Sequence, residues 1–264
     1  MLPAFDLGPL EIKTYGAMIA LAVIVGGMFM FHRLLRLNTS AGVLMRGVIV
    51  GIAGGLATAY VVAMIPILAY NALPDFPRPT EGLSVTWVIA GGFFTAIIYC
   101  RLCKMPVGRT FDLFVVPVPL AQAIGRLGCF ASGDSYGKPT DSWLGIYLPD
   151  DHGQWAVRYP TQLMSSATNL AIFIVLLSVE RYSGRRRKEK GLPPGGHPFD
   201  GFLAILYVIL FALKRFLVGF LRENTAPLIG PLSQLQIFAL FGIAAALALL
   251  AWNLKHLRRH LHAS

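Results

Sequence analysis

Apolar runs long enough to cross the hydrocarbon core of a membrane recur along the whole sequence. A core of about 30 Å is crossed by a helix of about 20 apolar residues. Hydrophobic residues make up 55% of the chain and charged residues only 14%, which leaves little material for a water-facing surface. We therefore expect an integral membrane protein.

The breaks between these runs predict seven membrane spans. Each is expected to be helical, because an isolated strand cannot satisfy its backbone hydrogen bonds in lipid. The predicted fold class is all-α, a seven-helix bundle formed as one membrane domain by residues 1–264, with residues 131–160 as an outer interfacial loop. The expected spans are residues 14–36, 46–70, 82–102, 111–130, 161–180, 200–222 and 232–254.

Basic residues are concentrated in alternate connections, and short cytoplasmic loops are the ones that retain positive charge. The opposite connections are mostly acidic. This asymmetry predicts an outside N-terminus and a cytoplasmic C-terminus. It also explains the net charge of +10 through juxtamembrane loops, so nucleic-acid binding is not expected. The basic connections contain Arg33, Arg36 and Arg46; Arg101, Lys104 and Arg109; the run from Arg181 to Lys190; and Lys255, Arg258 and Arg259.

Arg126 and Arg215 fall inside predicted spans. A guanidinium keeps its charge, so placing it at membrane depth costs about 2.5 kcal/mol or more unless an anion or a water-filled cavity receives it. We expect both to belong to a functional site that takes an anion. Metal chemistry is not expected, because no histidine is expected at membrane depth and Cys100 and Cys103 lack a second pair.

The residues around Arg126 form a segment that resembles a known family signature. It runs from Gly125 to Gly137 with the sequence GRLGCFASGDSYG, and three other pieces match in the same order. These are Tyr15-Gly16, Tyr159-Pro160-Thr161-Gln162-Leu163, and Arg215-Phe216 with Phe220-Leu221-Arg222-Glu223. Over essentially its full length the chain is similar to the prolipoprotein diacylglyceryl transferases of bacterial inner membranes.

The resemblance implies an activity and two substrates. A diacylglyceryl group would pass from phosphatidylglycerol to the lipobox cysteine thiol of a preprolipoprotein signal peptide, forming a thioether. No cofactor is implied, and the protein would be a multi-pass protein of the inner membrane. A non-catalytic relative that binds anionic lipid or a lipoprotein precursor is the alternative, because several family positions differ here. Thr86 stands in place of histidine and Phe211 in place of tyrosine. Two asparagines of the family signature are replaced by Cys129 and Ser132, and two glutamates are replaced by Asp134 and Gly219.

The resemblance also implies roles for individual residues. Arg126 and Arg215 would hold the phosphate, and Asp134 would orient Arg126 or accept a proton, unless it forms an Asx-turn. Arg222 lies two helical turns beyond Arg215, where it would receive phosphate or snorkel to the interface. Lys214 is about 100° away from Arg215 around the helix, so Arg215 is the preferred ligand.

Five further residues are predicted to bind substrate, each beside a structural alternative. Gly125, Gly128 and Gly137 would let backbone approach the headgroup, or would pack helices. Tyr15 would hydrogen-bond the substrate or anchor the helix at the interface. Gln162 would bind headgroup oxygens or cap a helix. With Thr86 in place of histidine, water or a phosphate oxygen would accept the thiol proton.

Overall fold

The protein was analysed as a computed structural model that describes residues 4–7, 10–36, 41–72, 85–150, 153–189, 198–223 and 227–263. The chain divides into two compact units. The first contains residues 1–33 and 111–264, and the second contains residues 34–110. All residues proposed from the sequence for the site, apart from Thr86, belong to the first unit.

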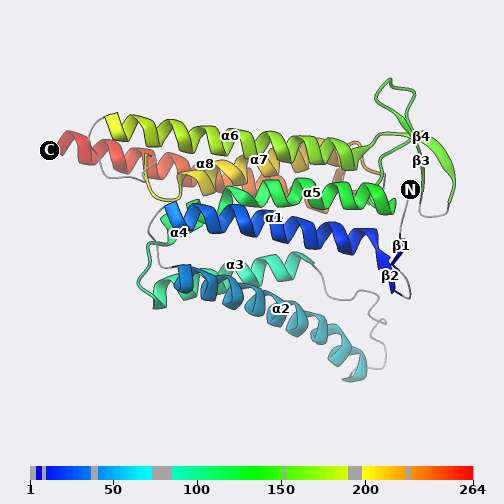
Figure 1. Cartoon of the computed structure of the whole chain (residues 1–264), viewed down its shortest axis with the longest axis horizontal. Helices are drawn as coiled ribbons and strands as arrows, with labels where there is room; N and C mark the ends of the chain where they lie inside the picture. Colours follow the sequence, from blue (N-terminus) through cyan, green and yellow to red (C-terminus); the bar gives the residue numbers. More distant parts are fainter. Residues whose placement is uncertain are drawn as a thin grey trace. The chain divides into compact units, whose positions relative to one another are not determined.

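Long helices dominate both units (Figure 1). Six of the described segments are long and apolar enough to cross a membrane, which establishes an all-α, multi-pass membrane architecture. The sequence predicted seven. The span expected at 82–102 corresponds to α3 (Val85–Leu102), where the shorter segment Gly91–Leu102 is apolar. The six spans are Thr14–Arg33, Met45–Ile65, Val107–Ser132, Thr161–Arg185, Phe202–Gly219 and Gln234–Leu257.

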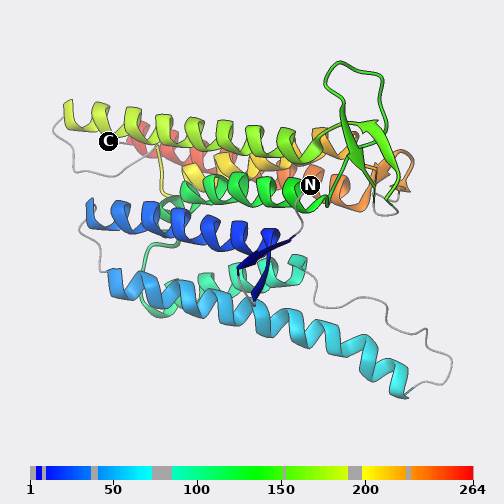
Figure 2. The same ribbon diagram turned by 45° about the vertical axis from the view of Figure 1, so that its right-hand side comes forward.

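In the first unit, the helices from α5 to α8 lie alongside one another in chain order, so that α6 contacts both α5 and α7 (Figures 1 and 2). A buried apolar cluster of Val115, Val116, Ile172, Leu176 and Leu203 joins the segment before α5 to α6 and α7. The bounds are α1 (Thr14–Arg36), α5 (Pro117–Ser132), α6 (Thr161–Glu189), α7 (Phe202–Gly219) and α8 (Gln234–Ala263).

The span predicted over 111–130 lies within the candidate span Val107–Ser132, but the structure corrects its expected single helix to two, α4 (Val107–Val115) and α5. Pro117 has no N–H, so it cannot donate to the carbonyl of Leu113 four residues earlier. Arg33 of α1 donates to that carbonyl instead, at 2.8 Å, and the same guanidinium pairs with Glu180 of α6. The proline therefore separates the two helices and frees an acceptor that ties α1 to α4.

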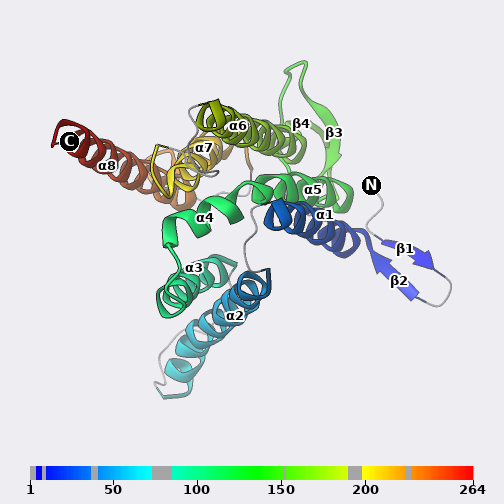
Figure 3. The ribbon, with the colours of Figure 1, turned by 60° about the vertical axis from the view of Figure 1, so that its left-hand side comes forward.

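Among the described residues, three short antiparallel hairpins accompany the helices, and the all-α prediction did not include them. The middle one, β3 (Ile146–Pro149) with β4 (Trp155–Arg158), lies within the predicted outer loop 131–160. In Figure 3 it stands beside the ends of α5 and α6. Its Tyr147 and Trp155 rings stack with centroids 5.3 Å apart. The others are β1 (Ala4–Leu7) with β2 (Leu10–Lys13), and β5 (Pro227–Ile229) with β6 (Leu232–Ser233).

The second unit is a helix pair, α2 (Ala41–Ala72) and α3, packed through small residues. A Cβ placed on Gly55 would meet the backbone of Val88, so only glycine permits this close approach. The Tyr99 hydroxyl donates to the carbonyl of Val43 at 2.9 Å and joins the same two helices. The two helices are therefore held by a close approach of their backbones and by the Tyr99 hydrogen bond.

Candidate functional site

The segment that follows α5 leaves the helix in a left-handed turn. Gly133 caps the helix with φ of 85°, and Ser135 also has a positive φ of 64°. The main-chain N–H of Asp134 still donates to the carbonyl of Cys129 at 3.0 Å. The chain thus leaves the helix that contains Arg126 through a left-handed turn.

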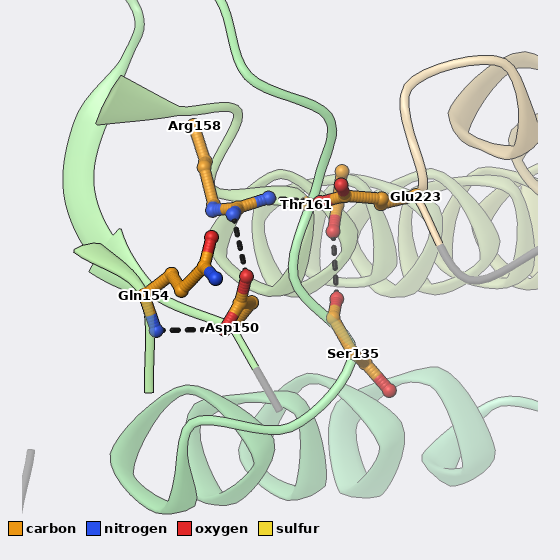
Figure 4. A network of polar contacts seen from close by, with 6 residues as sticks. All are labelled: Ser135, Asp150, Gln154, Arg158, Thr161 and Glu223. Carbon is orange, nitrogen blue, oxygen red and sulfur yellow. Dashed lines mark hydrogen bonds and ion pairs between the residues drawn. The ribbon is translucent and has the colours of Figure 1, made fainter. Parts of the chain in front are cut away.

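The start of α6 holds this turn in place. Gln162 donates from Nε2 to the carbonyl of Asp134, and Thr161 donates from Oγ1 to the carbonyl of Ser135, both at 2.8 Å. Figure 4 shows the second of these bonds. Both side chains are fully buried. Two motifs that lie 26 or more residues apart in the sequence are therefore one structural feature.

The segment after α7 lies against the other side of the same turn. Gly137 forms an isolated antiparallel bridge with Arg222, and the N–H of Lys138 donates to the carbonyl of Leu221 at 2.8 Å. A Cβ on Gly137 would meet the carbonyl oxygens of Tyr159 and Leu221, the latter at 2.9 Å. Gly137 is required here because two backbone segments of the protein itself approach it from both sides.

Arg158 links the hairpin to the end of α7 (Figure 4). Its guanidinium pairs with Glu223 and, at 3.0 Å, with Asp150. The Tyr136 ring lies 5.1 Å from the guanidinium carbon. Arg158 is 4% exposed, so these partners replace the water that its charge would otherwise need. The sequence interpretation placed Arg158 in the outer connections and did not single it out.

Three arginines lie close together in the first unit. Arg126 of α5 acts electrostatically on Arg215 of α7 and on Arg222. Burial and the charge of Arg126 lower the pKa of the Arg222 guanidinium, whereas Asp134 raises it. None of the three takes part in an ion pair between described residues. The cluster therefore has more positive than negative charge, which suits an anionic ligand.

A buried polar stripe on α6 faces this region. Gln162 and Asn169 lie three or four residues from the adjacent pair Ser165 and Ser166, which places all four on one side of the helix. Ser166 donates from Oγ to the carbonyl of Ala123 at 2.8 Å, and Asn169 accepts from Lys214 of α7 at 2.7 Å. The sequence interpretation found one end of the stripe and missed the rest, although the polar period was visible. The stripe consists of Gln162, Ser165, Ser166 and Asn169.

Gly125, Gly128 and Tyr15 occupy the contact between α1 and α5. A Cβ on Gly128 would lie 2.7 Å from the Met18 Cβ and 3.7 Å from the Tyr15 ring, and one on Gly125 would lie 3.6 Å from the Ile19 Cδ1. Tyr15 is 45% exposed. These contacts favour the helix-packing alternative for Gly128. Substrate contact by any of the three stays a prediction.

Two departures from the family pattern have structural counterparts. A side chain at Gly219 would meet Gln236 of α8, whose Nε2 donates to the carbonyl of Phe216 at 3.2 Å. Phe211 stands where the family has tyrosine, and its ring lies 4.1 Å from Lys214 Nζ. Thr86 begins α3 in the second unit, and its side chain is outside the described part of the protein. Among the described residues, no three His, Cys, Asp or Glu gather to hold a metal ion.

Comparisons with known proteins agree on one family. The family model described as prolipoprotein diacylglyceryl transferase matches residues 3–252. A phosphatidylglycerol–prolipoprotein diacylglyceryl transferase of Symbiobacterium thermophilum is 31% identical, across 96% of this chain and 92% of its own length. One of Clostridium tetani is 30% identical across 97% and 98%, and one of Dehalococcoides mccartyi is 31% identical across 92% and 90%.

Proposed function

Because this chain belongs to the prolipoprotein diacylglyceryl transferase family, we propose that it transfers the diacylglyceryl group of phosphatidylglycerol to the thiol of a prolipoprotein cysteine. The observation that carries the proposal is the cluster of Arg126, Arg215 and Arg222 without an ion-pair partner among the described residues. An anionic headgroup would supply the missing negative charge.

The reaction gives these cations a defined task. The thiol sulfur attacks the glyceryl carbon next to the phosphate, a C–S bond forms, and the C–O bond breaks with its electron pair on the phosphate oxygen. The phosphodiester has one negative charge and the released glycerol phosphate can have two. Arg126 and Arg215 would bind the phosphate through charge-assisted hydrogen bonds that strengthen as this charge develops. Arg222 would receive the headgroup at the end of α7.

Asp134 is proposed to orient the arginines. Its side chain is exposed and acts electrostatically on Arg222, and its backbone is held by Gln162. A carboxylate beside cations is a weak base, so an orienting role fits better than proton transfer. The Gln162 Oε1 is buried without a hydrogen-bond partner among the described residues, which suits a hydroxyl of the glycerol headgroup. Gly137 would support the site by holding the backbone of Arg222.

Tyr15, Gly125 and Gly128 are proposed to line the approach of the lipid from α1 and α5. The thiol proton would pass to water or to a phosphate oxygen, because threonine at residue 86 is not a base at neutral pH. The released glycerol phosphate dianion is itself a proton acceptor near neutral pH. It can therefore take up the thiol proton without a base from the protein.

The membrane arrangement is proposed to contain seven spans, the six candidate spans and α3, as one domain in the inner membrane of a bacterium. The basic connections would face the cytoplasm, and the turn after Arg126, the hairpin β3–β4 and the N-terminus would face outward. A prolipoprotein signal peptide would then meet Arg126 near the outer surface.

The test uses purified protein in phosphatidylglycerol vesicles with a lipobox peptide, read by mass spectrometry for a diacylglyceryl adduct on the peptide cysteine. We expect the adduct, and we expect it to disappear in Arg126→Gln. If the folded protein binds phosphatidylglycerol and forms no adduct, the second candidate is correct, a non-catalytic lipid-binding relative. The positions at which the chain departs from the family, Thr86 above all, favour that candidate.

A further inference from the structure

Lys214 is a buried cation whose only hydrogen bond in the described part of the protein goes to a neutral partner. It lies on α7, is 8% exposed, and donates from Nζ to the Oδ1 of Asn169 at 2.7 Å. The ring of Phe211 covers another side of the ammonium group, with its centroid 4.1 Å from Nζ. An ammonium group has three N–H donors, so at least one remains available.

The amide of Asn169 adds a second unused donor at the same place. Asn169 is 1% exposed. Lysine can only donate, so the amide atom that faces Lys214 must be the oxygen, and this settles which way the amide points. Its Nδ2 then has no hydrogen-bond partner among the described residues. Lys214 and Asn169 together form a buried pair, contributed by two helices, whose unused hydrogen-bonding atoms are all donors.

The charges around the pair have the same sign. Arg126 and Arg215 both act electrostatically on Lys214. The three ion pairs found between described residues involve Arg33 and Arg158 only, so no described carboxylate balances this group. A buried charge and buried N–H donors are costly when they have no partner. An oxygen ligand with negative charge would satisfy both requirements at once.

We propose that Lys214 and Asn169 bind a phosphate oxygen of the lipid and form a second, deeper part of the headgroup site. The proposal rests on the proposed function, since it assigns these residues to the same phosphate that Arg126 and Arg215 approach. Lys214 would offset with its positive charge the negative charge that the phosphate gains when the C–O bond breaks, whereas Asn169 orients the lysine through Oδ1 and donates from Nδ2. The ester carbonyl of an acyl chain is another oxygen within the lipid that a donor pair could bind.

A purely structural bond between α6 and α7 is the competing explanation, and variants separate the two. Lys214→Met leaves Asn169 without any partner, so it should lower the melting temperature of the lipid-free protein. The double variant Lys214→Met/Asn169→Leu removes both polar groups and should restore it, because an apolar pair of similar size needs no partner. If the bond is only structural, the double variant should also bind lipid normally.

The experiment measures the melting temperature of the full chain in a neutral detergent, alone and with dioleoylphosphatidylglycerol or dioleoylglycerol, together with the transfer assay. Lys255→Met, on an exposed part of α8, is the control. We expect phosphatidylglycerol to stabilise the wild type and the control more than dioleoylglycerol does. In the double variant that difference should be lost, and KM for phosphatidylglycerol should rise about tenfold, as expected for a charge-assisted hydrogen bond.

Two results would overturn the proposal. In the first, phosphatidylglycerol raises the melting temperature of the double variant as much as that of the wild type. In the second, the double variant loses stabilisation by both lipids equally, which would assign the donors to the ester carbonyl. The outcome for the proposed function is separate. If the wild type shows the Lys214-dependent stabilisation and forms no adduct, the transferase activity fails and the phosphate site stands. If it forms the adduct and the double variant matches it in KM, the transferase stands and the phosphate site fails.

Discussion

The side-chain amide of Gln162 donates a hydrogen bond to the main-chain carbonyl of Asp134 at 2.8 Å. This bond joins the first turn of α6 to the turn that follows α5, and it places a buried glutamine where the sequence alone indicated either a headgroup ligand or a helix cap. The backbone after Arg126 is therefore positioned by a side chain from another helix. The position of Asp134 depends on that contact.

Replacing Gln162 by leucine should reduce both stability and transfer. The carbonyl of Asp134 would lose a partly buried hydrogen bond, whose net contribution is about 0.5–1.5 kcal/mol. Thermal unfolding in detergent and the transfer assay would measure the two effects. Thr168→Ala is the matched control on α6, since Thr168 is exposed and bonds only within its own helix. Wild-type stability in Gln162→Leu would show that the turn is held by other contacts.

Transfer activity should depend on the guanidinium of Arg126 and should not depend on that of an exposed arginine. Arg126→Gln is expected to lower kcat/KM by at least about 100-fold, because it removes a donor from the position where phosphate charge develops. Arg126→Lys keeps the charge and loses the two-oxygen geometry, so it should recover only part of the activity. Arg259→Gln, on an exposed part of α8, should match the wild type. Equal activity of Arg126→Gln and the control would remove Arg126 from the site.

Gly137→Ala should destabilise the protein, whereas the separate variant Gly184→Ala should not. The new Cβ at residue 137 would meet the backbone carbonyls of Tyr159 and Leu221, and backbone cannot move aside as a side chain can. We expect a loss of about 1–3 kcal/mol from this overpacking. In Gly184→Ala, on α6, the Cβ would meet nothing within 4 Å, and alanine should gain about 0.5–1 kcal/mol from helix propensity. Unfolding curves of the two variants should therefore shift in opposite directions.

Arg158→Met should weaken the connection between the hairpin β3–β4 and the end of α7. Asp150 and Glu223 would both lose the cation that pairs with them. Because Glu223 is half exposed, we expect a loss of about 1–2 kcal/mol, less than for a fully buried pair. Limited proteolysis should show earlier cleavage in the hairpin than in Arg181→Met, a control on an exposed part of α6. Identical cleavage in the two variants would contradict a structural role for the pairs.

The hydrophobic pattern was a good guide to the helices and a poor guide to their internal breaks. α1 has the predicted bounds, 14–36, because a long apolar run between polar residues leaves the backbone no alternative to a helix in lipid. The same pattern hid the break at Pro117, where hydrophobicity continues across the proline. Arg33 was assigned to a basic juxtamembrane connection, and its partners, Leu113 and Glu180, lie 80 and 147 residues away.

In the candidate site, too, some residues could be predicted from the sequence and others could not. Arg126 and Arg215 were found from sequence because a charged residue in an apolar span needs a reason to be there. Lys214 was set aside in favour of its neighbour, since helical geometry places the two about 100° apart. In the structure Arg126 acts electrostatically on both, and the partner of Lys214 is Asn169, on a helix that the sequence interpretation had not connected with it.

The sequence by itself determined that this chain is a multi-pass helical membrane protein and to which family it belongs, and it predicted an anion site at the arginines in its apolar segments. The length of the apolar runs suffices for the first conclusion, because lipid excludes unpaired backbone. The family follows from matching motifs along the chain, and the predicted site follows from the cost of an unpaired charge in lipid. Only the tertiary structure decided that Gln162 holds the Asp134 turn, that Gly137 is enclosed by two backbone segments, and that Lys214 meets Asn169. Such pairings depend on which faces of distant helices meet, and residue spacing within one helix does not specify its neighbour.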